Sequence, residues 1–149
     1  MEQAEQALPF ELTFAAKPED IRDALGQVRA VLRRSVGDEA LAARAEQVLA
    51  EALNNVEEHA YAGGDAGPVR LSLSQQGNDL CAVIRDRGFA MPQGRPPNGR
   101  LPATDVARED LPEGGFGWYL IRHLSDSLIY KRDEGENYLG LCFSARSDG

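Results

Sequence analysis

Apolar residues between positions 41 and 56 recur every three or four residues, which predicts an amphipathic helix, and a further helix is predicted before it. A short alternating strand at residues 10–15 precedes the first helix, and a proline followed by two acidic residues marks where that helix begins. The first helix is expected to end at residue 35 or 36. Asp38 then has the side chain of an N-cap for the second helix, which should end near Ala60.

The second predicted helix has an apolar face and, beside it, a stripe of polar residues. The stripe consists of Glu51, Asn55 and Glu58, and its first two members lie one helical turn apart. A polar stripe is usually a solvated helix face, but this one borders the core, where a carboxylate and an amide can serve as a base and a metal ligand. The apolar positions are Leu41, Ala45, Val48, Leu49, Ala52, Leu53 and Val56.

The second half of the chain changes to a period of two from Val69 onward, as in a sheet that is wet on one side. A hairpin turn precedes the continuous apolar run at residues 80–84, which is expected to be a central strand. Two further strands are predicted at residues 128–131 and 138–145, joined by a turn at residues 135–137. Together the elements predict an α/β (α+β) two-layer sandwich, with a mainly antiparallel sheet and helices on one face.

Residues 89–113 follow a different pattern, because they hold five of the chain's eight prolines and show no sustained period. A structureless segment of this length is normally a lid, a binding loop or disorder. A glycine cluster at residues 114–117 and a short apolar helix from Trp118 come next. We therefore expect a single domain over residues 1–149, with a flexible loop beside the start of its last helix.

Composition narrows the functional classes. A chain of 149 residues can bury one continuous core, and a net charge of −8 argues against a nucleic-acid surface. Cys81 and Cys142 lie in apolar runs, which suits small buried thiols in a reducing compartment. Two cysteines and two histidines without ligand spacing argue against zinc. The start of the chain has neither a secretory signal nor a membrane span, so a cytoplasmic location is expected.

Two short glycine motifs, taken with the helix stripe, match the parts of ATP. Asp86, at the end of the apolar strand, can accept a hydrogen bond from the exocyclic amine of adenine, and Gly88 removes a side chain that would block the base. Glycines at residues 115–117, at a helix start, expose backbone N–H groups to phosphate. Asn55 offers an oxygen to Mg²⁺, and Glu51 can accept the proton of an attacking hydroxyl.

These motifs resemble those of the small serine/threonine kinases of the GHKL ATPase superfamily that act as anti-sigma factors in bacterial partner switching. The resemblance covers nearly the whole chain. Residues 51–61 resemble the family's N-box, including its His-Ala-Tyr ending, and residues 86–88 resemble its adenine-binding box. Residues 115–117 resemble its second glycine box. The resemblance implies a GHKL-type, histidine-kinase-like ATPase fold with an ATP lid at about residues 89–114.

The resemblance also implies roles for individual residues. Glu51 would be the general base that activates a serine hydroxyl or water, Asn55 the Mg²⁺ ligand, and Asp86 the adenine contact. The pocket and the phosphate cradle would be shaped by Gly88, Gly115, Phe116 and Gly117.

The function implied by the resemblance is an ATP-dependent serine/threonine protein kinase that acts as an anti-sigma regulator, with ATP and Mg²⁺ as cofactors. Its substrate would be a serine on a small anti-anti-sigma protein of the STAS type, also called the antagonist. Its second partner would be a sigma factor or an analogous regulator, with no direct contact to nucleic acid or membrane. Relatives of this kind form homodimers, which makes a homodimer one of the assembly states to test.

Two residues depart from the pattern of some relatives. Ala90 stands where a second glycine of the adenine box can occur, which fits the shorter box of the anti-sigma branch. Glu113 stands where an arginine can precede the second glycine box. An arginine that stabilises the γ-phosphate must therefore come from elsewhere in the lid, and Arg108 and Arg100 are the candidates.

Two alternative functions remain beside the kinase. The first is a catalytically weak module that binds a sigma factor or another partner in a nucleotide-dependent way without phosphoryl transfer; Glu113 favours it, and the intact pair of Glu51 and Asn55 argues against it. The second is the catalytic domain of a histidine kinase, which is disfavoured because no dimerisation helix with a phosphoacceptor histidine fits before residue 38.

Overall fold

The computed structural model describes residues 8–61, 64, 66–91, 94–97 and 115–146. The helices are α1 (Pro18–Ser35), α2 (Glu39–Asn55), which continues as the π-helical turn η2 (Val56–Ala60), and α3 (Gly115–Leu124). The strands are β1 (Phe10–Ala15), β2 (Pro68–Gln76), β3 (Asp79–Asp86), β4 (Ser127–Asp133) and β5 (Glu136–Phe143).

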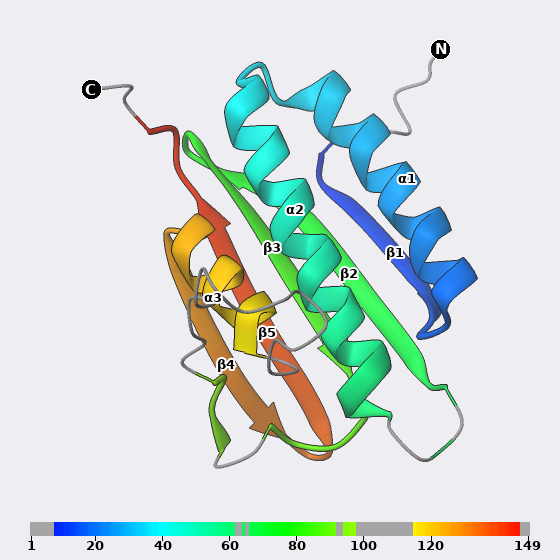
Figure 1. Ribbon diagram of the computed structural model, residues 1–149. Helices are drawn as coiled ribbons and strands as arrows, with labels where there is room; N and C mark the ends of the chain where they lie inside the picture. The colour runs from blue at the N-terminus through cyan, green and yellow to red at the C-terminus, as the bar shows by residue number, and fades with distance from the viewer. Residues whose placement is uncertain (1–7, 62–63, 65, 92–93, 98–114, 147–149) are drawn as a thin grey trace, which may run out of the picture.

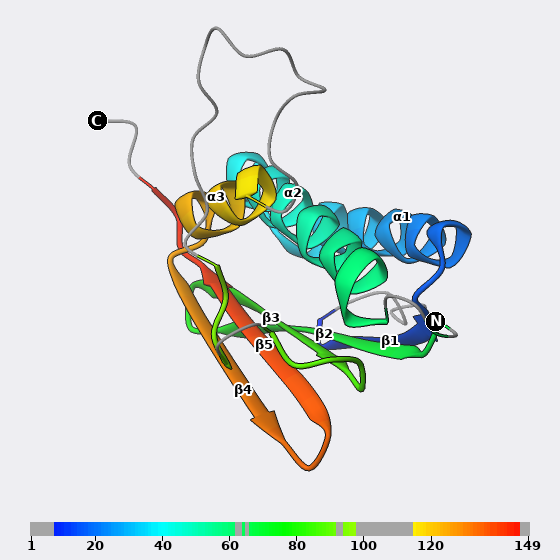
Figure 2. The ribbon, with the colours of Figure 1, turned by 60° about the horizontal axis from the view of Figure 1, so that its bottom comes forward.

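The described strands form one sheet in the order β1-β2-β3-β5-β4, and every neighbouring pair in it is antiparallel. The last of these strands along the chain thus lies between β3 and β4 (Figure 1). The described α-helices lie side by side over one face of the sheet, with α2 between α1 and α3 (Figures 1 and 2). The predicted two-layer sandwich is confirmed.

The core lies between α2 and the central strands. All seven apolar positions predicted on the second helix are buried. The sheet contributes alternate residues, as a pleated strand requires when one face is covered. From the two central strands these are Leu80, Ala82, Ile84, Leu139, Leu141 and Phe143.

The start of α2 agrees with the boundary predicted from the sequence, whereas the start of α3 differs from its predicted position. Leu41 N donates to Oδ1 of Asp38 at 3.1 Å, which confirms the predicted N-cap. The last helix begins at Gly115 rather than at Trp118, so its glycines lie inside the first turn. Among the described helices, none has the length and apolar character needed to cross a membrane.

The predicted turn at residues 135–137 is wrong in its last two residues. Glu134 and Gly135 make the turn, with left-handed φ values of 52° and 79°, and Glu136 already belongs to β5. Asn137 is the second residue of that strand and faces the covered side, in the same alternation as Leu139. A polar residue close to a glycine favours a turn in the sequence, but the pairing of β4 with β5 draws Asn137 into the strand.

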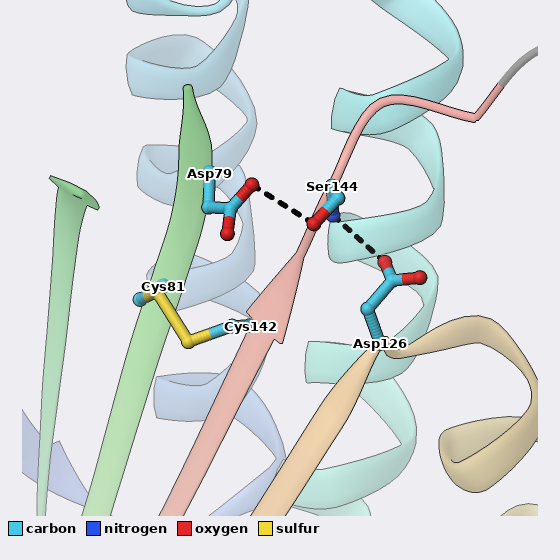
Figure 3. Close-up of a disulfide and its surroundings, with 5 residues drawn as sticks. All are labelled: Asp79, Cys81, Asp126, Cys142 and Ser144. Atoms are coloured by element: carbon cyan, nitrogen blue, oxygen red, sulfur yellow. Dashed lines mark hydrogen bonds between the residues drawn. A yellow bond between two sulfur atoms is a disulfide. The ribbon is translucent and has the colours of Figure 1, made fainter. Parts of the chain in front are cut away.

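The expectation of two free buried thiols is also wrong, because Cys81 and Cys142 form a disulfide between β3 and β5 (Figure 3). The two residues are direct partners in the antiparallel register. Strand alternation turns both side chains to the face without helices, where they are half-buried. Near them, Ser144 Oγ donates to Asp79 Oδ1 at 2.8 Å and Ser144 N donates to Asp126 Oδ2 at 2.7 Å.

Candidate functional site

The structure brings Glu51 and Asn55 of α2 against the first turn of α3. A methyl group on Gly117 would lie 2.8 Å from Oε1 of Glu51 and 4.0 Å from Oδ1 of Asn55. The glycine therefore leaves room for the Glu51 carboxylate in its present orientation, while Asn55 lies at ordinary contact distance. The N-box helix and the second glycine motif, which are far apart in the sequence, thus lie together in space.

Glu51 is half-buried and sits in an environment that disfavours its charge. Burial raises the pKa of the Glu51 carboxyl above its ordinary value, and the nearby Glu58 carboxylate raises that pKa further. A carboxylate with a raised pKa is a stronger base once it is ionised. This is the property that a general base requires.

Asn55 carries a buried side-chain atom without a partner. Its Nδ2 makes no hydrogen bond to any described residue. Turning the amide over would put Oδ1 at that position instead, so the group can present either a donor or a hard oxygen to a ligand. An oxygen of this kind, supplemented by phosphates and water, fits the coordination that Mg²⁺ prefers. No cluster of three or more His, Cys, Asp or Glu side chains occurs in the described part, and a phosphate-held Mg²⁺ needs none.

Asp86 is the last residue of β3 and is buried, with 7% of its surface exposed. Its Oδ1 accepts hydrogen bonds from Gly88 N at 2.9 Å and from Asn137 Nδ2 at 2.8 Å. Both described bonds end on the same oxygen, which leaves Oδ2 to accept a donor from a ligand. The carboxylate is thus held in one orientation at the end of the sheet.

The structure gives a second reason for a glycine at position 88, beside the predicted one. A methyl group there would lie 2.1 Å from the carbonyl oxygen of Ala60, and Phe89 N donates to that same oxygen at 2.6 Å. The missing side chain therefore makes room for the backbone at the end of η2, in addition to any ligand. This contact joins the end of the N-box helix to the end of β3.

Tyr61 stabilises the same junction between the end of η2 and the end of β3 by hydrogen bonds. Its hydroxyl donates to the carbonyl of Pro68 at 2.9 Å and accepts from Arg87 N at 2.7 Å. The ring occupies the space that a side chain on Gly67 would need. His59, by contrast, is exposed and lies 3.7 Å from Glu58.

Sequence reasoning missed two residues that lie at the edge of the site. Asn137 on β5 bonds to Asp86, and its signal was the apolar alternation that continues from it along the strand. Arg122 on α3 donates to the carbonyls of Pro97 at 2.7 Å and Pro96 at 2.9 Å, so it ties the described end of the loop to the helix. No sequence pattern marked that second contact.

Part of the predicted site falls beyond the described ranges. Arg108 and Arg100 lie outside the described residues, as do Glu113 and most of the segment predicted as a lid. Gly115 is the first residue of α3 and Phe116 the second.

Two solved structures share this fold. The RsbU and RsbW domains of a Mycobacterium tuberculosis protein superpose with a TM-score of 0.64 at 18% identity, covering 91% of this chain and 32% of that chain. The histidine kinase domain of the Erythrobacter litoralis blue-light activated histidine kinase superposes with a TM-score of 0.50 at 17% identity, covering 83% of this chain and 60% of that chain. At such identities the likeness establishes the fold alone.

Curated relatives are similar over part of their length. The serine/threonine-protein kinase BtrW of Bordetella bronchiseptica is 34% identical over 91 residues, covering 61% of this chain and 62% of the relative. The serine-protein kinase RsbW of Bacillus cereus is 30% identical over 93 residues, covering 61% of this chain and 57% of the relative. The RsbW of Halalkalibacterium halodurans is 35% identical over 89 residues, covering 58% and 53%. The matched region thus spans about half to three fifths of these proteins.

The family itself is identified over a longer stretch, which includes β2 to β5, α2 and α3 and therefore all the site residues described above. The sequence profile of the histidine kinase-like ATPase domain matches residues 14–143. This chain is a member of the histidine kinase-like ATPase domain family.

Proposed function

We propose that this chain is an ATP-dependent serine/threonine protein kinase that acts as an anti-sigma regulator. The observation that carries the proposal is the contact between α2 and α3, where Gly117 leaves the Glu51 carboxylate and the Asn55 amide side by side at a helix start. Similarity to proteins named serine/threonine-protein kinase and serine-protein kinase supports the same reaction.

In the proposed reaction, a serine hydroxyl of the substrate attacks the γ-phosphorus of ATP. The bond from the serine oxygen to phosphorus forms, the bond from phosphorus to the β-phosphate oxygen breaks, and ADP leaves. Glu51 accepts the hydroxyl proton, for which its raised pKa suits it. Asn55 would hold Mg²⁺, which supplies charge neutralisation for the phosphates when it is bound.

Recognition of the nucleotide is assigned to the ends of the sheet and of α3. Oδ2 of Asp86 accepts a hydrogen bond from the adenine amine, since Oδ1 already accepts from Gly88 N and Asn137 Nδ2. The backbone N–H groups of residues 115–117 face phosphate at the helix start. Residues 89–114 form the ATP lid, and Arg108 or Arg100 within it stabilises the γ-phosphate.

The proposed partners are a small STAS-type anti-anti-sigma protein, which receives the phosphate on a serine, and a sigma factor or an analogous regulator. The names of the relatives as kinases support a protein substrate. The proposed location is the cytoplasm, where such partners and ATP occur, and a homodimer is the proposed assembly state.

Transfer of labelled γ-phosphate from ATP to purified candidate antagonists from neighbouring genes tests this function. Wild-type protein should transfer the labelled phosphate to a serine of one of these antagonists. Glu51→Ala should keep Mg-ATP and partner binding but lose about 10²-fold or more in rate, the usual scale for a general base. Asn55→Ala should also weaken Mg-ATP binding, whereas Asn54→Ala, on the exposed side of the same helix, should change neither property.

The same experiment separates the kinase from a nucleotide-dependent binding module. If wild-type protein transfers no phosphate to any serine partner, yet binds a sigma factor in a nucleotide-dependent way, the kinase proposal fails. The binding module then stands in its place, in line with Glu113 where some relatives carry arginine.

A further inference from the structure

Asn137 uses every hydrogen-bonding position of its amide. Its Nδ2 donates to Asp86 Oδ1 at 2.8 Å and to the carbonyl of Phe89 at 2.9 Å. Its Oδ1 accepts from the Tyr130 hydroxyl at 2.5 Å and from Arg132 Nη1 at 2.8 Å. A longer bond joins Nδ2 to the carbonyl of Gly88 at 3.4 Å. The residue is buried at 5% exposure, so these five bonds replace its contacts with water.

The arrangement requires an amide in one orientation. Asp86 and the Phe89 carbonyl are acceptors, so only the nitrogen can face them, while Tyr130 and Arg132 supply the donors for the oxygen. An aspartate at position 137 would donate nothing and would set a second carboxylate against Asp86. An alanine would remove these bonds, and among the described residues Oδ1 of Asp86 would keep only its bond from Gly88 N.

The partners of Asn137 also hold the chain where it leaves β3. Arg132 Nη1 donates to the carbonyl of Gly88 at 2.9 Å, and Met91 N donates to the Tyr130 hydroxyl at 3.1 Å. These contacts, with the Asn137 bond to the Phe89 carbonyl, fix residues 88–91 against the β4–β5 hairpin. One cluster therefore positions both the Asp86 carboxylate and the first residues of the loop that follows it.

We propose that Asn137, supported by Tyr130 and Arg132, is a positioning residue that sets adenine specificity by holding Oδ1 of Asp86 so that Oδ2 is presented to the nucleobase. The proposal rests on the assignment of Asp86 to adenine in the proposed function. It goes beyond that assignment because it places the control of specificity in a hairpin that contacts Asp86 rather than the base.

Comparing ATP with ITP in calorimetric titrations tests the proposal, since inosine carries an oxygen in place of the exocyclic amine. Wild-type protein should bind ATP more tightly than ITP, because the carboxylate would face an acceptor in ITP. Asn137→Ala removes one of the two described bonds that hold Oδ1 of Asp86, so the ratio of the two affinities should fall by about tenfold, the scale of one buried hydrogen bond to a charged group. If the affinity falls equally for both nucleotides, so that the ratio stays the same, Asn137 has a merely structural role.

Two further variants keep the test decisive if Asn137→Ala does not fold. Tyr130→Phe removes only the hydroxyl that Asn137 accepts from, and it should lower the ATP to ITP ratio by a smaller factor while the ring stays in place. Tyr138→Phe is the matched control, because its ring lies on the opposite face of the hairpin, beside Arg85 and Lys131, and it should leave the ratio unchanged. An unchanged ratio in Tyr130→Phe would overturn the proposal.

The outcomes separate this proposal from the one on which it rests. If wild-type protein binds ATP and ITP equally, the adenine contact of Asp86 fails. If wild-type protein discriminates and the Asn137 and Tyr130 variants discriminate equally well, only the positioning role of the cluster fails.

Discussion

Gly117 of α3 lies so close to Glu51 of α2 that a methyl group on the glycine would be 2.8 Å from the carboxylate oxygen Oε1. The conflicting atom is the far end of a flexible side chain, which can turn away at little cost. Gly117→Ala should therefore leave the free energy of unfolding within about 1 kcal/mol of wild type, since alanine also favours the helix. The displaced base should slow phosphoryl transfer by about tenfold or more, as steady-state kinetics beside thermal unfolding would measure. Full activity in a folded Gly117→Ala protein would contradict the site geometry.

Gly88→Ala should give the opposite result. Its methyl group would meet the carbonyl oxygen of Ala60 at 2.1 Å, and backbone cannot rotate away as a glutamate side chain can. We expect a loss of about 2 kcal/mol or more in stability from the forced backbone shift. Denaturant unfolding measures it. A Gly88→Ala protein as stable as wild type would show that the junction between η2 and β3 is looser than described.

The pH dependence of phosphoryl transfer should follow Glu51. Its pKa is raised by burial and then by Glu58, so the rate should fall as the pH falls through that raised pKa and the base is protonated. Glu58→Gln removes the second cause and should move the acidic limb of the rate profile to lower pH. Glu57→Gln removes the same charge one position away and should leave the limb in place. If the acidic limb does not move in Glu58→Gln, that limb does not report the ionisation of Glu51.

The same raised pKa has a consequence for stability. Folded protein holds the Glu51 proton more tightly than unfolded protein does, so stability decreases as the pH rises from the unfolded to the folded pKa. Glu51→Gln cannot ionise and should lose that decrease. Denaturation of the two proteins at a series of pH values compares the slopes.

The disulfide between Cys81 and Cys142 should contribute to stability. It links residues that are 61 positions apart, and the loop-entropy estimate for such a link is about 4 kcal/mol. A dithiol reductant should therefore lower the unfolding midpoint of wild type, while the double variant Cys81→Ser, Cys142→Ser should start lower and not respond. Equal midpoints for wild type with and without reductant would argue against a formed bond.

The sequence predicted the layers and the positions of several candidate-site residues because those features are periodic. Helical spacing identified the buried face of α2 and placed Glu51 and Asn55 beside it. Alternation identified the covered face of β2, a continuous apolar run identified β3 as a central strand, and the glycine motifs marked the end of β3 and the start of α3. Each of these signals is local, so it can be read without knowing which segments meet.

The features that the sequence did not predict depend on which strands are neighbours. The disulfide exists because β5 pairs with β3 in a register that sets Cys81 opposite Cys142, although β4 comes between them along the chain. Asn137 meets Asp86 by the same pairing. The role of Gly88 depends on the path of the backbone at Ala60. Local periodicity can place Asn137 on the covered face of β5, but it does not show which residues meet in any of these contacts.

We propose above all that Asp86 anchors the adenine of ATP at the end of β3. Calorimetric titration with Mg-ATP of Asp86→Asn beside wild type tests it most directly. The substitution keeps the size of the side chain but replaces a carboxylate acceptor with an amide, and the fold should persist because the amide retains one oxygen for Gly88 N and Asn137 Nδ2. We predict that tight binding of Mg-ATP is lost in the folded variant. An affinity equal to that of wild type would contradict the account.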